Sequence, residues 1–73
     1  MSGEMFLRRA GETEWHQVRT YRSASRGYVP HALTACNEYI VHAPAHSEAA
    51  YGLPPTPLCK RCIKHGAKPM GSP

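Results

Sequence analysis

The sequence predicts a small α+β domain in which β-hairpins precede one short C-terminal helix. Three observations predict this class. The chain has 73 residues, which is enough for one domain with a limited core. Residues 14–22 alternate in the way that strands do. The segment that begins at the last cysteine pair is closed by Gly66, which is typical of a short helix.

The first two strands are expected at residues 4–9 and 14–22, with Gly11 at a turn position between them. Successive side chains of a strand point to opposite faces, so the second strand has two distinct sides. One side carries Trp15, Gln17, Arg19 and Tyr21, and the other carries His16, Val18, Thr20 and Arg22.

A loop at residues 23–27 leads to a third strand at residues 31–35 and a fourth at residues 38–42. Cys36 and Asn37 lie at the turn between these two strands. Residues 43–58 contain four prolines and are expected to be mostly loop, with one helical turn at residues 47–50.

The short helix is expected at residues 59–65. A flexible N-terminus at residues 1–3 and a disordered tail at residues 67–73 leave a single domain at residues 4–66.

The composition indicates a thin core. Six glycines and seven prolines leave little chain for regular structure, and the apolar residues are scattered. Domains of this size usually need disulfides, a metal ion or a partner for stability. We therefore expect one of these three to reinforce the fold.

The cysteines favour a metal ion. There are three, which leaves one thiol unpaired in any disulfide scheme, and a Cys59–Cys62 disulfide would close only a tiny loop. The first nine residues have no apolar stretch that resembles a signal peptide, and no segment is apolar enough to span a bilayer. A reducing cytoplasm, where cysteines near histidines more often bind metal, is the expected location, with no membrane partner.

Cys59 and Cys62 are separated by two residues, a spacing that aims both sulfurs at one point. Zinc takes four ligands at tetrahedral corners, usually as two pairs from separate elements. Cys36 is the expected third ligand. Five histidines compete for the fourth place, and spacing alone separates them little. It ranks them His42, His16, His31, His65 and His46.

A family resemblance favours His16. Trp15-His16, Gly27, Thr34-Ala35-Cys36 and Leu58-Cys59-Lys60-Arg61-Cys62 follow in that order. This order resembles the small zinc-finger-like proteins of actinobacteria and their phages, which have one histidine and three cysteines as ligands. The resemblance covers about two-thirds of the chain and implies His16 as the fourth ligand. Asn37 departs from the pattern, since a glycine commonly follows the middle cysteine in the family.

The expected fold is thus a small α+β zinc finger of zinc-ribbon or treble-clef type, with one structural Zn²⁺. A site with three thiolates and one imidazole leaves no open position for water. We therefore expect binding rather than catalysis, and no small-molecule substrate.

The first expected function is a protein-interaction adaptor or inhibitor of a cytoplasmic target, or of a host target if the chain is phage-encoded. It would dock through an exposed strand edge or through residues 43–58. The alternative is a DNA- or RNA-binding finger, in keeping with a net charge of +4. The residues expected to bind are Arg19, Tyr21, Arg22, Lys60, Arg61 and Lys64.

Overall fold

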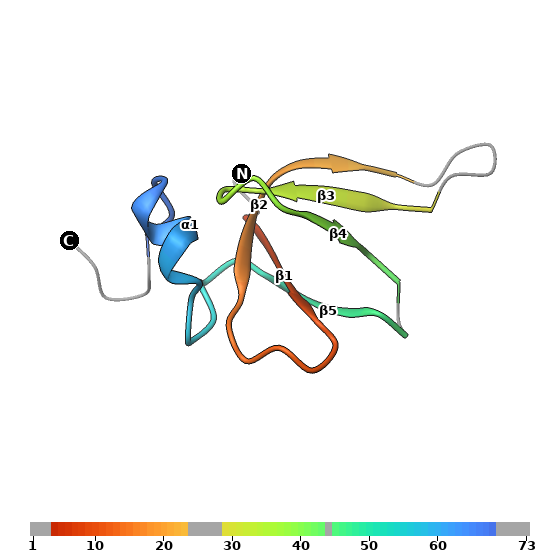
Figure 1. Cartoon of the computed structure of the whole chain (residues 1–73), viewed down its shortest axis with the longest axis horizontal. Helices are drawn as coiled ribbons and strands as arrows, with labels where there is room; N and C mark the ends of the chain where they lie inside the picture. The colour runs from red at the N-terminus through yellow and green to blue at the C-terminus, as the bar shows by residue number, and fades with distance from the viewer. Residues whose placement is uncertain (1–3, 24–28, 44, 69–73) are drawn as a thin grey trace.

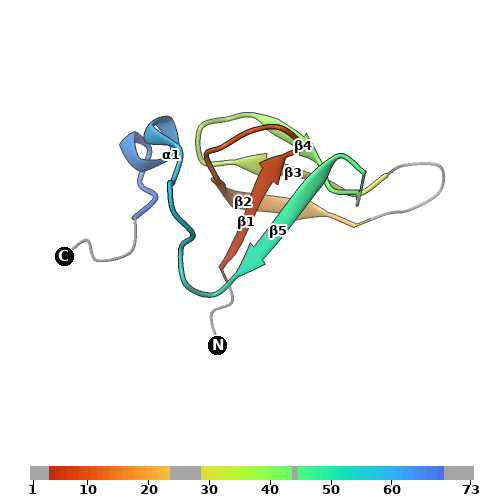
Figure 2. The same cartoon turned by 90° about the horizontal axis from the view of Figure 1, so that it is seen from below.

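Within the residues that it describes, the computed structural model contains one five-stranded antiparallel sheet and one short helix, which lies at one end of the sheet (Figures 1 and 2). It describes residues 4–23, 29–43 and 45–68. The elements are β1 (Met5–Arg9), β2 (His16–Arg22), β3 (His31–Thr34), β4 (Tyr39–Val41), β5 (Ser47–Tyr51) and α1 (Lys60–Lys64).

The strands lie in the order β4-β3-β2-β1-β5. The first four follow one another as a meander, and β5 returns to pair with β1 on its free side. The sheet is curled, which brings β1 near β4 although two strands separate them in the order: Nη2 of Arg9 in β1 donates to the carbonyl of Tyr39 in β4 at 2.9 Å (Figure 1). The α+β class and the C-terminal helix are therefore as predicted, while the zinc-ribbon or treble-clef type stays a prediction.

The curled sheet has two small cores, and β1 contributes to both. Phe6 and Leu7 are adjacent, so they point to opposite faces, and both are fully buried. Leu7 packs with Ala32 and Ile40 inside the curl. The second core lies between β1 and the C-terminal segment and holds Phe6, Ala35, Cys36, Leu58, Cys59, Cys62 and Ala67. All three cysteines are thus part of the second core.

Strand β2 contains a β-bulge at Arg19. Val18 pairs with Thr34 and Thr20 pairs with Leu33, so Arg19 is an extra residue without a partner on β3. After the bulge the side chains change face, and Tyr21 pairs with the buried Ala32. The predicted assignment of residues 15–22 to two faces is therefore wrong beyond Arg19.

The helical turn predicted at residues 47–50 is also wrong, because this segment is β5. Its five residues pair in register with β1, from Arg9↔Ser47 to Met5↔Tyr51. Pairing with a distant strand therefore decides the conformation of a segment whose local composition favours loop or helix. Residues 1–3, 24–28, 44 and 69–73 lie outside the described part of the chain, and they include the predicted flexible N-terminus and residues 69–73 of the predicted tail. Ala67, the first residue of the predicted disordered tail at residues 67–73, is described and is buried in the second core.

Among the residues described, none belongs to a helix with the length and apolar character needed to cross a bilayer.

Candidate metal centre

The turn between β3 and β4 presents Cys36. The Thr34 N–H donates to the Glu38 carbonyl at 2.9 Å, and the Glu38 N–H donates to Oγ1 of Thr34 at 3.0 Å. Asn37 has a φ of 66°, in the left-handed region. Asparagine visits this region more readily than most residues, so Asn37 fits the turn without a glycine.

A second backbone contact places Cys59 beside His16. Trp15 and Leu58 form a short parallel bridge. The Trp15 N–H donates to the Pro57 carbonyl at 2.9 Å, and the Cys59 N–H donates to the Trp15 carbonyl at 2.6 Å. The C-terminal segment is thereby fixed next to the first residue of β2.

Helix α1 begins directly after Cys59 and carries Cys62 in its first turn. The Ile63 N–H donates to the Cys59 carbonyl at 3.0 Å, and the Ala67 N–H donates to the Cys62 carbonyl at 2.9 Å. Cys62 is fully buried as a result. The helix therefore directs the sulfurs of Cys59 and Cys62 inward toward one point, as the spacing of the two cysteines predicts.

Four buried side chains converge at this place: His16, Cys36, Cys59 and Cys62. One ligand atom from each lies within 4.8 Å of the others. Nδ1 of His16 is 3.6 Å from Sγ of Cys36 and 3.8 Å from Sγ of Cys62. A tetrahedral zinc ion with ordinary Zn–N and Zn–S bonds sets these edges at about 3.6 Å. The two distances from Nδ1 thus match these edges, and the four donor atoms lie close enough together to hold one metal ion.

Glu12 accounts for the orientation of the His16 ring. Its Oε1 lies 3.2 Å from Nε2 of His16, so Nε2–H donates to the carboxylate and the lone pair of Nδ1 faces the sulfurs. Metal-bound histidines commonly donate their second ring nitrogen to a carboxylate in this way. The sequence alone did not predict a role for Glu12. The only signal for it was a carboxylate four residues before the histidine.

Thr34 supports Cys36 in a similar manner. Its hydroxyl lies 3.2 Å from Sγ of Cys36 and accepts the Glu38 N–H, so its own hydrogen is available to the sulfur. Thr34 is fully buried. A buried hydroxyl that donates to a thiolate stabilises the charged form, which is the form that binds metal.

Burial raises the pKa of the Cys62 thiol to about 12. Backbone hydrogen bonds from Gln17 and Cys36 lower this pKa, whereas the Cys36 side chain raises it through a hydrogen bond and through charge repulsion, and burial remains the largest cause. Without a cation the thiol therefore keeps its proton at neutral pH. A bound divalent ion would reverse this preference, because it attracts the thiolate directly.

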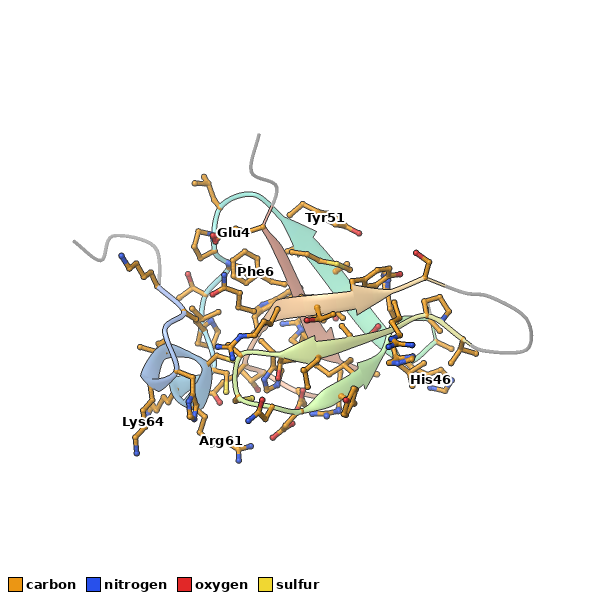
Figure 3. All side chains as sticks on the ribbon, turned by 90° about the horizontal axis from the view of Figure 1, so that it is seen from above. Glu4, Phe6, His46, Tyr51, Arg61 and Lys64 are labelled. Carbon is orange, nitrogen blue, oxygen red and sulfur yellow. The ribbon has the colours of Figure 1, made fainter. Side chains whose placement is uncertain are left out.

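The other histidines lie elsewhere in the described structure. Nδ1 of His42 is hydrogen-bonded to the Tyr21 hydroxyl at 2.8 Å. His31 packs against Tyr39. His46 lies at the end of the molecule opposite α1, and His65 is exposed just after the helix (Figure 3). None of the four is among the residues that converge with the cysteines.

The residues predicted to bind a partner are divided between two places. Arg19 donates to the carbonyl of His65 at 3.1 Å and lies beside the end of α1. Arg61 and Lys64 project from the helix, where Arg61 pairs with Glu38 (Figure 3). Lys60 is exposed at the start of the same helix, whereas Tyr21 and Arg22 occupy the far end of β2.

Comparisons with protein-family models, with curated proteins and with solved structures find no match to this chain. The resemblance to the actinobacterial and phage proteins therefore stays a prediction. The only support for a metal centre is therefore the arrangement of the four side chains in this structure.

Proposed function

We propose that the chain is a zinc-stabilised binding module in which His16, Cys36, Cys59 and Cys62 hold one structural Zn²⁺. The observation that carries the proposal is the convergence of three sulfurs and one imidazole nitrogen in a buried place. Soft thiolate ligands with one imidazole in tetrahedral arrangement favour zinc over calcium or magnesium, which prefer oxygen.

The donor set supports a structural role. Four protein ligands fill a tetrahedral shell, whereas catalytic zinc sites keep one position for water or substrate. The proposed site therefore has no place where a reactant would coordinate. We infer that the module acts by binding another molecule and that it has no enzymatic activity of its own.

The proposed ion would join three separate parts of the chain: the start of β2, the β3–β4 turn and α1 with its preceding residue. Zinc contributes on the order of 10–16 kcal/mol of apparent binding energy in finger peptides, and this energy also stabilises the fold. The two small clusters of buried side chains supply a limited core in a chain of this length. Zinc is therefore expected to decide whether the C-terminal segment stays folded onto the sheet.

Docking on a cytoplasmic protein, as an adaptor or inhibitor, remains one use of such a module. Its two edge strands, β4 and β5, have the exposed tyrosines Tyr39 and Tyr51. Residues 43–58 offer less free chain for docking than expected, since Ser47–Tyr51 is already paired with β1.

Metal analysis of the purified chain tests the proposal. Native mass spectrometry should find one zinc ion per chain, and the His16→Ala and Cys62→Ser variants should lose it. His46→Ala is the matched control, because His46 is exposed and distant from the cluster (Figure 3). Removal of zinc by a chelator should abolish the cooperative unfolding transition. A His16→Ala variant that keeps one zinc ion with wild-type affinity would contradict the ligand set.

A further inference from the structure

The outward face of β2, β3 and β4 carries two rows of side chains that cross all three strands. Thr20, Leu33 and Tyr39 form one row, and Arg22, His31 and Val41 form the other. All of them but Val41 line one hollow of about 210 Å³. The bulge at Arg19 creates this face, because it turns Thr20 and Arg22 outward together.

Tyr39 is the most prominent side chain of the face. It is 66% exposed, and its ring centroid lies 5.9 Å from that of His31. It also borders a second hollow of about 400 Å³ at the edge between β4 and β1, where Arg9 and His46 are among the lining residues. The tyrosine therefore stands between two hollows, each of which has an arginine and a histidine.

Arg22 is the basic side chain of this face that remains free of a carboxylate partner among the described residues, since Arg9 pairs with Glu12 and Glu38. None of the residues that line the two hollows carries a carboxylate. Glu38, next to Tyr39 in the chain, already pairs with Arg9 and Arg61. Arg22 forms no ion pair with any residue that the structure describes. An anionic partner would therefore meet an uncompensated arginine and no repelling side chain from the lining.

We propose that this face, defined by Thr20, Arg22, His31, Leu33 and Tyr39, binds single-stranded nucleic acid. A base would stack on the Tyr39 ring, and phosphates would lie against Arg22. Proteins that bind single strands combine exposed aromatic rings with a positively charged groove, because every base offers a flat face and every linkage a charge. The proposal names a partner class for the binding module and rests on its zinc-stabilised fold.

Fluorescence anisotropy with the zinc-loaded full chain tests the stacking. The probes are labelled single strands of thymidine or uridine of about 15 nucleotides, which is within the usual range of site sizes. Loss of one base–aromatic stack should weaken binding of Tyr39→Ala by about 5- to 100-fold. Tyr39→Phe should bind as the wild type does. Tyr51→Ala is the matched control, since Tyr51 is 65% exposed on β5, outside this face, and its loss should leave affinity unchanged.

A salt titration tests the charge. Each phosphate contact in a single strand contributes about 0.7 to the slope of log K against log salt concentration. Arg22→Gln should reduce the magnitude of this slope by about 0.7. Lys68→Gln is the control, because Lys68 is exposed outside this face and its replacement should leave the slope unchanged.

Two outcomes would overturn the proposal: no binding at strand concentrations of about 100 μM in low salt, or equal losses in Tyr39→Ala and Tyr51→Ala. Equal affinity for an acidic peptide such as polyglutamate would also overturn it, since a peptide of that kind offers charge without bases. Zinc content is measured on every variant. Tyr39→Ala should keep one zinc ion and the wild-type circular dichroism spectrum, so failure of this proposal is distinct from failure of the metal site.

Discussion

At the scale of single residues, the candidate centre depends on side chains that are not ligands. Glu12 holds one nitrogen of the His16 ring, so the other nitrogen faces the sulfurs. Thr34 offers a hydrogen bond to Cys36. Such partners lower the cost of ordering the ligands and favour the form that binds metal. The affinity of the site for zinc should therefore respond to residues that never touch the ion.

Glu12→Ala tests this dependence. Loss of a carboxylate behind a metal-bound histidine typically weakens metal binding by about 10- to 100-fold. Competition with a coloured zinc chelator measures the affinity. Glu14→Ala is the control, because Glu14 lines the same cleft as Glu12 and His16 and has no hydrogen bond to His16. Equal affinities of the two variants for zinc would show that Glu12 does not position the ring.

At the scale of the element, the β3–β4 turn depends on a residue in the left-handed region of the backbone. Asn37 in the left-handed region lets the turn close between Thr34 and Glu38 with Cys36 directed inward. Residues with a Cβ pay about 1–2 kcal/mol in this region, and asparagine pays less than most. The identity of residue 37 should thus affect stability without a contact to the metal.

Asn37→Ala should lower the free energy of unfolding by about 1 kcal/mol, because alanine has the strain of a Cβ without the local hydrogen bonds of asparagine. Asn37→Gly should match the wild type or exceed it, since glycine adopts a positive φ without strain. Urea unfolding of the zinc-loaded chain measures both. A more stable alanine variant would mean that the turn does not hold the conformation described.

At the scale of the whole molecule, the sequence predicts local elements better than their assembly. The four meander strands and the helix follow from turn residues, alternation and the cysteine spacing. Strand β5 was not predicted, because its conformation comes from pairing with β1, which is far away in the chain. The bulge at Arg19 was also missed, since an extra residue in one strand is visible only once its partner is known.

In the candidate site, too, the sequence predicts the local part better than the part set by the fold. The spacing of Cys59 and Cys62 predicts a pair of sulfurs directed at one point, and the structure brings them together with Cys36. Spacing alone did not single out His16 among the five histidines. His16 lies at the cluster because two backbone contacts hold cysteines beside it. The parallel bridge at Trp15 fixes Cys59 there, and the hydrogen bond from the Ala35 N–H to the Gln17 carbonyl fixes Cys36. Contacts of this kind are set by the whole fold.

The pH dependence of zinc uptake is also a property of the whole molecule. The pKa of the Cys62 thiol is raised to about 12, mainly by burial, so the metal-free fold retains this proton at pH 7. Zinc binds the thiolate and must displace the proton, so its affinity rises with pH and falls as the solution is made acidic.

Calorimetry in two buffers of different ionisation enthalpy measures this proton. At least one proton should leave for each zinc ion bound at pH 7. Zinc uptake without any proton release would mean that the thiols are already ionised in the metal-free chain.

X-ray absorption spectroscopy at the zinc edge decides whether three sulfurs and one nitrogen hold the ion, because it reports the atoms bound to it. The account predicts a first shell of three sulfurs at about 2.3 Å and one nitrogen at about 2.0–2.1 Å. A shell with oxygen ligands, or with fewer than three sulfurs, would contradict a closed site made by His16, Cys36, Cys59 and Cys62.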